Sequence, residues 1–442
     1  MSHIAGADAL LEVAVLVQLL TITTGMLAGA VASAIWLKLW RYAVAVSYAA
    51  SIVRSDSVGS GLSTSLWHVV QFGPLAIAAV PLLTGKNASM RPIDLGILAC
   101  LALFAFCALV TAFTGVFRAQ TLAQSALLVL MFGFLALTLS RRWLTLEVIR
   151  QDLTLGFGLI CGAQVVGLIG ALTHQPWATA DYGRFEGLFS NANYAGAMSA
   201  IGLMIGLYVI SSELRNHMAW GIAGMLALGL TLLLSGSRGA LLALVVGLIP
   251  LVRIRASRRV VLLAVGGVIA VGLGLTVMSY LRPSLGGAFN RALQGSDITS
   301  GRLQIYSELV TRWWHMPWFG TGYRTTELLT GPHRLTGHDT YLSVLTETGI
   351  VGAVVFIVLL VLILQAGPAL KTNRALLGAV VTVLMVEVTE SFLFGWGSPI
   401  PIFEWLTLLG FAAEGRLSGA VAAWPWSSRS QGPSDRRSIV VG

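Results

Sequence analysis

Charged residues are scarce in this sequence. Only 11% of its 442 residues are Asp, Glu, Lys or Arg, whereas 56% are hydrophobic. A soluble domain needs roughly a quarter of its residues charged to cover its surface. The scarcity of charge therefore excludes an ordinary soluble protein and indicates an integral membrane protein. The 49 glycines fit this class, because small residues let membrane helices approach each other closely.

Cysteine is rare as well, and the three residues present (Cys100, Cys107 and Cys161) all lie inside apolar runs. No CxxC or Cys/His ligand spacing occurs, which argues against a zinc site or a disulfide framework. The sequence also lacks a Walker A loop, and Gly320-Thr321-Gly322 alone is too weak a pattern to indicate nucleotide binding. These absences give no sign of a zinc site, a disulfide framework or a bound nucleotide.

Long apolar runs make up most of the chain and predict an all-α polytopic membrane protein. Residues 8–53 hold one or two spans, and one span there gives a total of about twelve. The expected organisation is a helix bundle over 1–280, a partly helical loop over 281–339, further spans over 340–418 and a flexible tail over 419–442. The other runs long enough to cross a bilayer are 66–83, 94–117, 120–140, 149–172, 192–212, 217–235, 238–252, 259–280, 340–365, 375–395 and 400–416.

Basic residues predict the orientation of the spans. The formal net charge is +9, and its clusters flank apolar runs, so we assign it to topology rather than to nucleic-acid binding. The cluster at 253–259 belongs in the cytoplasm by the positive-inside rule, and counting spans from it puts Arg141, Arg142 and Arg150 there too. The same count puts residues 173–191, the turn 235–239 and the loop 281–338 on the outer face. Positive charge on that face opposes the rule and indicates an anionic ligand.

Two short outer segments carry an arginine beside a helix start. Arg184 precedes Asn191 and Asn193 at the entrance to the run 192–212. Asn191 or Ser190 can cap that helix, and a helix N-terminus attracts anions. The alternative is a plain cap with an arginine whose stem snorkels along the membrane. Arg238 stands in the tight Ser-Gly-Ser-Arg-Gly turn that separates two apolar runs.

The long outer loop contributes a helix, a group of tryptophans and a histidine. Ser300-Gly301-Arg302 predicts a helix start, with apolar residues following at helical spacing. Arg302 there opposes the helix dipole, a small cost that an anionic partner would explain. Trp313, Trp314 and Trp318 are typical of a helix at the headgroup level.

His338 is the candidate base, because it stands where the loop meets an apolar run and a neutral imidazole accepts a proton near neutral pH. Two histidines of the same loop, His315 and His333, compete for this role. Glu387 and Glu390 lie within an expected span, where carboxylates are costly. We expect them to pair with the arginines or to orient the histidine.

The ordered motifs resemble the O-antigen ligase family of bacterial membrane glycosyltransferases, within a wider ligase and polymerase superfamily. They cover residues from about 180 to 350, whereas the N-terminal half is similar only in hydropathy. The motifs are Arg184-x-x-Gly187-x-Phe189-x-Asn191-x-Asn193, Ser237-Arg238-Gly239-Ala240, Ser300-Gly301-Arg302, Gly320-x-Gly322 and His338-Asp-Thr-Tyr-Leu-x-x-Leu-x-Glu347-x-Gly349.

The resemblance implies a fold of GT-C type and a transfer without nucleotide sugar or metal. The donor would be an O-antigen polysaccharide on undecaprenyl diphosphate and the acceptor a sugar hydroxyl of lipid A–core, at the periplasmic face of the inner membrane. Carried over by position, His338 is the base, and Arg184, Arg238 and Arg302 hold the diphosphate. Supporting roles fall to Asn191, Asn193, Asp339, Tyr341 and Glu347.

The residues themselves fit this chemistry. Arginine binds phosphate through bidentate contacts and keeps its charge. No Asp-x-Asp cluster lies on the outer face to hold Mg²⁺, and no carboxylate pair suggests a glycosidase mechanism. Asp339, where family members often have asparagine, can support His338 or simply cap the helix. An O-antigen polymerase or a protein O-oligosaccharyltransferase with the same donor is the alternative enzyme. A lipid-linked sugar transporter is disfavoured, because no paired repeat is visible.

Overall fold

The computed structural model of the chain describes residues 73–76, 79–80, 82–83, 89–179, 184–189, 191–212, 218–252, 302–326, 338–368, 373–395 and 400–418. Every named element among these residues is a helix, as the hydropathy pattern predicted. The helices are α4 (Pro92–Thr114), α5 (Arg118–Leu137), η1 (Thr138–Arg142), α6 (Leu146–Leu172), η2 (Pro176–Ala178), α7 (Ala192–Ser212), α8 (Met218–Ser235), α9 (Arg238–Val252), α12 (Arg302–His315), α14 (Thr340–Ala366), α15 (Arg374–Thr389) and α16 (Ile400–Leu417).

Five helices in the described part of the chain are long and apolar enough to cross a membrane, namely α4, α5 with η1, α6, α7 and α14. The helices α8 and α9 are apolar but shorter. These helices support a multi-pass membrane protein. The total of about twelve spans and the GT-C arrangement stay predictions, since the expected spans in 8–53 and 259–280 lie outside the described residues, as does the basic cluster at 253–259.

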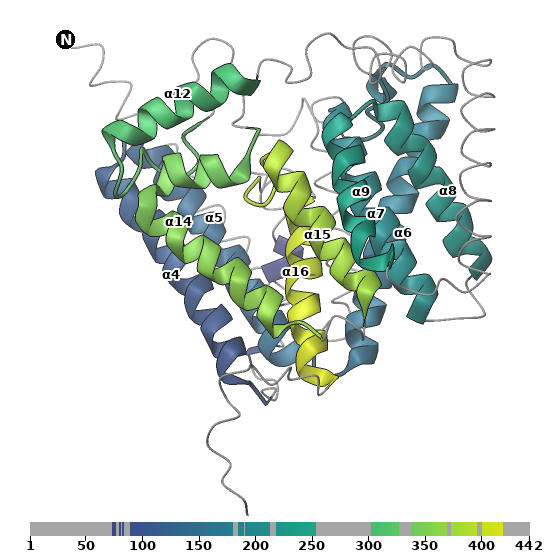
Figure 1. Cartoon of the computed structure of the whole chain (residues 1–442), viewed down its shortest axis with the longest axis horizontal. Helices are drawn as coiled ribbons and strands as arrows, with labels where there is room; N and C mark the ends of the chain where they lie inside the picture. Colours follow the sequence, from purple (N-terminus) through teal and green to yellow (C-terminus); the bar gives the residue numbers. More distant parts are fainter. Residues whose placement is uncertain are drawn as a thin grey trace, which may run out of the picture.

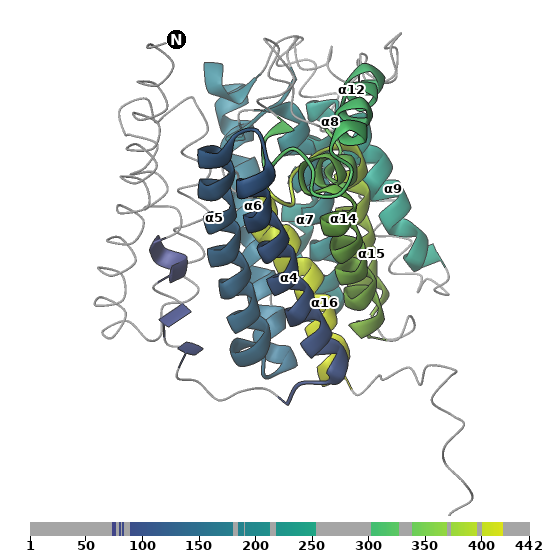
Figure 2. The same ribbon diagram turned by 90° about the vertical axis from the view of Figure 1, so that its left-hand side faces the viewer.

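Successive helices run in alternating directions, so the chain returns repeatedly to the same two ends of the bundle (Figure 1). Helix α12 lies at one end, against the beginning of α14, and Figure 2 shows it at that end from a second direction. We call this the α12 end. Helix α6 separates Arg142, at the opposite end, from Arg184, at the α12 end, in agreement with the count of basic clusters.

Arginines at the opposite end form ion pairs with carboxylates and hydrogen bonds with backbone carbonyls. Arg142 forms an ion pair with Asp152 at 2.7 Å, and Arg91 pairs with Asp94 at 2.9 Å. Arg416 donates to the carbonyls of Leu139 and Trp143, near the end of the α5–η1 helix. Such contacts satisfy carbonyls that a helix end leaves without a partner. These arginines therefore help to fix the bundle at the end that we expect to face the cytoplasm.

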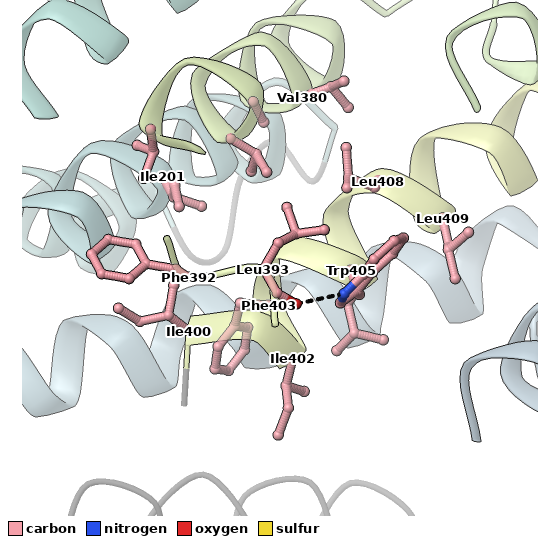
Figure 3. Packing of buried hydrophobic residues seen from close by; sticks show 14 of the residues in the cluster. Ile201, Val380, Phe392, Leu393, Ile400, Ile402, Phe403, Trp405, Leu408 and Leu409 are labelled. Atoms are coloured by element: carbon pink, nitrogen blue, oxygen red, sulfur yellow. Dashed lines mark hydrogen bonds between the residues drawn. The ribbon is translucent and has the colours of Figure 1, made fainter. Parts of the chain in front are cut away.

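Helix α15 ends at Thr389, six residues before the apolar run does, and Glu390–Gly395 is not helical. Buried apolar side chains of α7, α15 and α16 surround this short segment (Figure 3). The indole N–H of Trp405 donates to the carbonyl of Leu393 at 2.9 Å, and the ring of Phe394 stacks on Phe104 with centroids 5.1 Å apart. The segment that carries Glu390 is therefore held firmly in the bundle.

Helix α14 is broken at Gly349, although the sequence predicted one continuous span. Gly349 has φ 66° and ψ −171°, a conformation available in practice only to glycine. The break leaves a short helix over 340–348, which begins next to His338, and a longer helix over 350–366. The direction of the chain at His338 therefore follows the short helix and not the longer one.

The loop that follows α12 fills the break in α14. The N–H groups of Thr321 and Gly322 donate to the carbonyls of residues 346 and 347, at 2.9 and 3.1 Å. In return, the N–H of Ile350 donates to the carbonyl of Pro317 at 2.8 Å. Backbone groups freed inside a membrane need such partners. The motif Gly320-x-Gly322 thus has a structural role, since it lets one backbone approach another.

Candidate functional site

Glu390 joins the candidate base to one of the candidate arginines. One carboxylate oxygen, Oε2, lies 3.1 Å from Nδ1 of His338, and the other, Oε1, accepts from the guanidinium of Arg302. The three residues come from the start of α12, the entrance to α14 and the end of α15. Glu390 is 4% exposed, whereas the side chains of His338 and Arg302 are each 21% exposed. The carboxylate is thus buried beneath two groups that reach the surface.

The backbone of His338 is held in an unusual conformation. Its φ is +46°, in the left-handed region that few residues other than glycine adopt. The hydroxyl of Tyr306 on α12 donates to the His338 carbonyl at 3.0 Å. Burial raises the pKa of this hydroxyl further above neutral pH, so it stays a donor. Contacts from two other elements therefore fix both the main chain and the imidazole of His338.

Asp339 caps helix α14. Its Oδ1 accepts from the N–H of Leu342 at 2.9 Å, the usual contact of an N-cap residue. Burial raises the pKa of the carboxyl, and hydrogen bonds from the backbone of residues 342 and 341 oppose this rise. Of the two roles that the sequence left open, capping is the one that this contact supports.

Arg184 connects the turn after α8 to the start of α7. Its Nε donates to the carbonyl of Ser235 at 2.8 Å, and its guanidinium donates to Oδ1 of Asn193 at 2.6 Å. Asn191 caps α7, because its Oδ1 accepts from the N–H of Asn193 at 2.8 Å. The three residues that the sequence grouped are therefore in contact, and at least part of their role is structural. Ser190 lies outside the described residues.

Arg238 is the first residue of α9 and follows the turn at Ser235. The next residue, Gly239, lies so close to α15 that a Cβ there would be 2.5 Å from the hydroxyl of Thr389. Thr389 directly precedes Glu390. Nearby, the ring of Tyr194, in the first turn of α7, packs edge-on against Phe392 at 4.5 Å. The starts of α7 and α9 thus meet the end of α15, which brings Arg184 and Arg238 to the same end of the bundle as His338.

Two candidate supporting residues contact other parts of the fold. The hydroxyl of Tyr341 donates to the carbonyl of Leu384, on α15, at 3.0 Å. Glu347 is buried and accepts from both the backbone and the hydroxyl of Thr326, at 3.2 and 2.7 Å. It lies beside the loop that fills the break in α14. These contacts give Tyr341 and Glu347 roles in packing; a part in catalysis stays a prediction.

The exposed apolar side chains of α12 and the loop after it fit a helix at a membrane surface. Leu303, Trp314 and Trp318 are each more than half exposed, whereas Ile305 and Leu309 are buried against the bundle. Indole rings of this kind are enriched where lipid headgroups meet hydrocarbon. The helix start expected at residue 302 agrees with α12; Ser300, Gly301 and Gly337 lie outside the described residues.

The carboxylate beside the imidazole permits general-base chemistry. If Nδ1–H donates to Glu390, the lone pair of the neutral ring lies on Nε2, which can take a proton. The negative charge of Glu390 then stabilises the imidazolium that forms. Among the residues that the structure describes, no three His, Cys, Asp or Glu side chains are grouped so as to hold a metal ion. The anionic partner of Arg302 in the structure is Glu390. The sequence predicted that Glu387 and Glu390 would pair with arginines or orient the histidine, but it did not assign the partners.

Comparison with protein families gives a match over part of the chain. The family described as O-Antigen ligase matches residues 223–357, which include Arg238, Arg302 and His338 but neither Arg184 nor Glu390. No curated protein matches the chain. The match supports a function of the O-antigen ligase or polymerase type, hence a transferase that uses lipid-linked polysaccharide. Residues 223–357 are thus similar to the O-antigen ligase family, which confirms the resemblance that the ordered motifs predicted.

Proposed function

We propose that this protein is an O-antigen ligase that transfers polysaccharide from undecaprenyl diphosphate to a sugar hydroxyl of lipid A–core, without a metal ion. The observation that carries the proposal is the contact of His338 and Arg302 with one buried carboxylate, Glu390. Arg184 and Arg238 lie at the same end of the bundle. The match to the O-antigen ligase family over 223–357 supplies the class of substrate.

His338 acts as the base in this reaction. Nε2 takes the proton of the acceptor hydroxyl while Nδ1–H is held by Glu390. The hydroxyl oxygen then forms a bond to the anomeric carbon of the donor sugar, and the bond from that carbon to the diphosphate oxygen breaks. Undecaprenyl diphosphate leaves with the bonding electrons, and the proton stays on the imidazole until water removes it. Glu390 offsets the positive charge on the ring throughout.

The arginines stabilise the leaving diphosphate. Charge builds on its oxygens as the glycosidic bond breaks, and preorganised cations in a site shielded from water lower the energy of that state. A guanidinium has five N–H donors, so Arg302 can contact Glu390 and still face a phosphate. The contacts of Arg184 with Ser235 and Asn193 set the plane of its guanidinium. Arg238 adds its charge at the N-terminus of α9, where helix dipoles favour anions.

The α12 end of the bundle faces the periplasm in this proposal, and the protein resides in the bacterial inner membrane. Support comes from the basic clusters, which the positive-inside rule assigns to the opposite, cytoplasmic end. Undecaprenyl-linked polysaccharide and lipid A–core would both reach the site from the membrane. The exposed tryptophans of α12 would then lie at the headgroup level.

A polymerase or a protein O-oligosaccharyltransferase would use the same donor with another acceptor. Lipopolysaccharide from a deletion strain separates the first two activities. A ligase deletion removes all O-antigen from the core and leaves lipid-linked polymer of normal length, whereas a polymerase deletion leaves single repeats on the core. Transfer to a protein in place of lipid A–core would identify the third activity.

Purified protein with lipid-linked donor and lipid A–core tests the assignment of the base. We expect His338→Ala to abolish transfer while donor binding is retained. His315→Ala is the matched control, since His315 is exposed in the last turn of α12 and should be dispensable. Full transfer by the His338 variant, or loss of transfer in the His315 variant alone, would show that His338 is not the base. Unchanged kinetics in Arg184, Arg238 and Arg302 variants would refute the diphosphate clamp.

A further inference from the structure

A second pair of carboxyl groups lies inside the bundle, close in sequence to the candidate site but not part of it. Glu387 is in the last turn of α15, and Glu404 is in the second turn of α16. Both residues are 0% exposed. The two helices pack against each other, which brings the two carboxyl groups close enough for each to affect the charge of the other. Two charged carboxylates in such a place would repel each other and lose their hydration, so the arrangement needs an explanation.

Glu387 has the surroundings of a charged carboxylate. Its Oε2 accepts from the hydroxyl of Thr340 and from the N–H groups of Phe392 and Leu393, the latter two at 3.3 and 2.9 Å. Three donors on one oxygen stabilise negative charge. Its other oxygen, Oε1, has no hydrogen-bond partner among the described residues. Glu387 therefore offers one unused acceptor in a buried position.

Glu404 has the surroundings of a neutral carboxylic acid. Neither of its oxygens meets a donor in the described part of the chain. A buried carboxylate without donors is far costlier than a protonated carboxyl group. A proton on Glu404 would let its carboxyl group donate an O–H···O hydrogen bond to Glu387, whose Oε1 is the oxygen without a donor. One proton thus gives Oε1 of Glu387 a partner and leaves only the uncharged carbonyl oxygen of Glu404 without one.

The contacts of Glu387 connect the two segments that carry the candidate base and its carboxylate. Thr340 stands two residues after His338, at the start of α14. Phe392 stands two residues after Glu390, in the non-helical segment that follows α15. A single oxygen of Glu387 holds both segments. The separation of His338 Nδ1 and Glu390 Oε2 therefore depends on Glu387.

We propose that Glu404, as a protonated acid, and Glu387, as a carboxylate, form a positioning pair that sets the geometry of His338 and Glu390. Tyr341 also faces this pair, but its hydroxyl donates to the carbonyl of Leu384 and so does not supply the missing donor. Neither carboxyl group touches substrate. The effect of this pair on catalysis rests on the proposed function, whereas the proton on Glu404 does not.

Infrared spectroscopy of the purified full-length protein tests the proton directly. The wild type should show the C=O stretching band of a buried protonated carboxyl group, and Glu404→Gln should lack this band. The amide of glutamine still donates to Oε1 of Glu387, so Glu404→Gln should keep the melting temperature of the wild type. Persistence of the band in Glu404→Gln, or a melting temperature as low as that of Glu387→Ala, would overturn the proposal. So would Na⁺ or Mg²⁺ raising the melting temperature of the wild type only, since that would show a cation between the carboxylates.

Kinetics test the positioning role. We expect kcat of Glu404→Gln to match the wild type and that of Glu387→Ala to fall by about 10²-fold, the cost of a misplaced reacting group, with little change in KM for the donor. The kcat of Glu387→Gln should lie between those of the two other variants, because its amide oxygen accepts hydrogen bonds from the same three donors but carries no charge. Where Glu387→Ala fails to fold, Glu387→Gln carries the test. Equal kcat in Glu387→Gln and the wild type, or a change confined to KM, would refute positioning. A wild type inactive toward the proposed substrates would refute the ligase assignment and leave the spectroscopic test intact.

Discussion

Replacement of Glu390 by glutamine is the sharpest test of the proposed site. The substitution keeps the size of the side chain and removes its charge. Glu390 Oε2 lies 3.1 Å from His338 Nδ1, and a unit charge pair at that distance interacts with about 5 kcal/mol at an effective dielectric constant of about 20. Solvent screens part of this, because the His338 side chain is 21% exposed, and we expect about 3 kcal/mol to remain. The Glu390→Gln variant would lose this free energy in the transition state, in which His338 becomes an imidazolium. Its kcat should therefore fall by about 10²-fold.

The assay is transfer from lipid-linked polysaccharide to lipid A–core by purified protein, with kcat and KM measured for both substrates. Glu414→Gln is the control, since Glu414 is also 4% exposed but lies at the opposite end of the bundle, where it accepts from Asn373. We expect a lower melting temperature in both variants and a lower kcat in the Glu390 variant only. A kcat for Glu390→Gln within about threefold of the wild type would refute the stabilisation of His338 by Glu390, because less than 1 kcal/mol would then be at stake.

Three further predictions concern contacts around the site. Arg184→Lys cannot keep both hydrogen bonds of the guanidinium, so we expect a loss of about 1–3 kcal/mol in unfolding free energy and a higher KM for the donor; a KM equal to that of the wild type would limit Arg184 to packing. Asp339→Ala should cost about 1 kcal/mol in unfolding free energy by removing the cap of α14, and Asp339→Asn should restore both stability and activity; an Asn variant that is stable but inactive would refute a role limited to capping. Gly349→Ala should prevent stable folding, because the added Cβ would overlap the backbone of Trp318; thermal unfolding measures this effect. The control is Gly158→Ala, in α6 with open space around it, which should be neutral or slightly stabilising.

The helices could be predicted from the sequence because each signal is local. The apolar run and the capping aspartate at 339 are enough to place the start of α14, and Arg302 begins α12 as expected. The break at Gly349 could not be predicted in this way. Its hydrogen bonds come from residues 317–322, about thirty positions earlier, and nothing in the apolar pattern of 340–365 shows that another segment enters it.

Part of the candidate site could be proposed from the sequence. The motifs named Arg302 and His338, and Glu390 stood out as a carboxylate in an apolar run, yet no partner could be assigned to it. Its partners lie 88 and 52 positions away in the sequence, so only the packing of α12, α14 and α15 reveals the contact. The family match ends at residue 357 and does not reach Glu390. Glu387 and Glu390, three residues apart, looked equivalent in the sequence but have different neighbours in the structure.

The break in α14 has a consequence for sequence variation. The hydrogen bonds that fill it are formed between main-chain atoms, which every residue except proline provides in full. Side chains at most of these positions can therefore change without loss of the break. Gly320, Gly322 and Gly349 are the exceptions, since each has positive φ and little or no room for a Cβ. Homologous chains that have diverged widely elsewhere should still have these three glycines, and a chain without them should carry a straight α14.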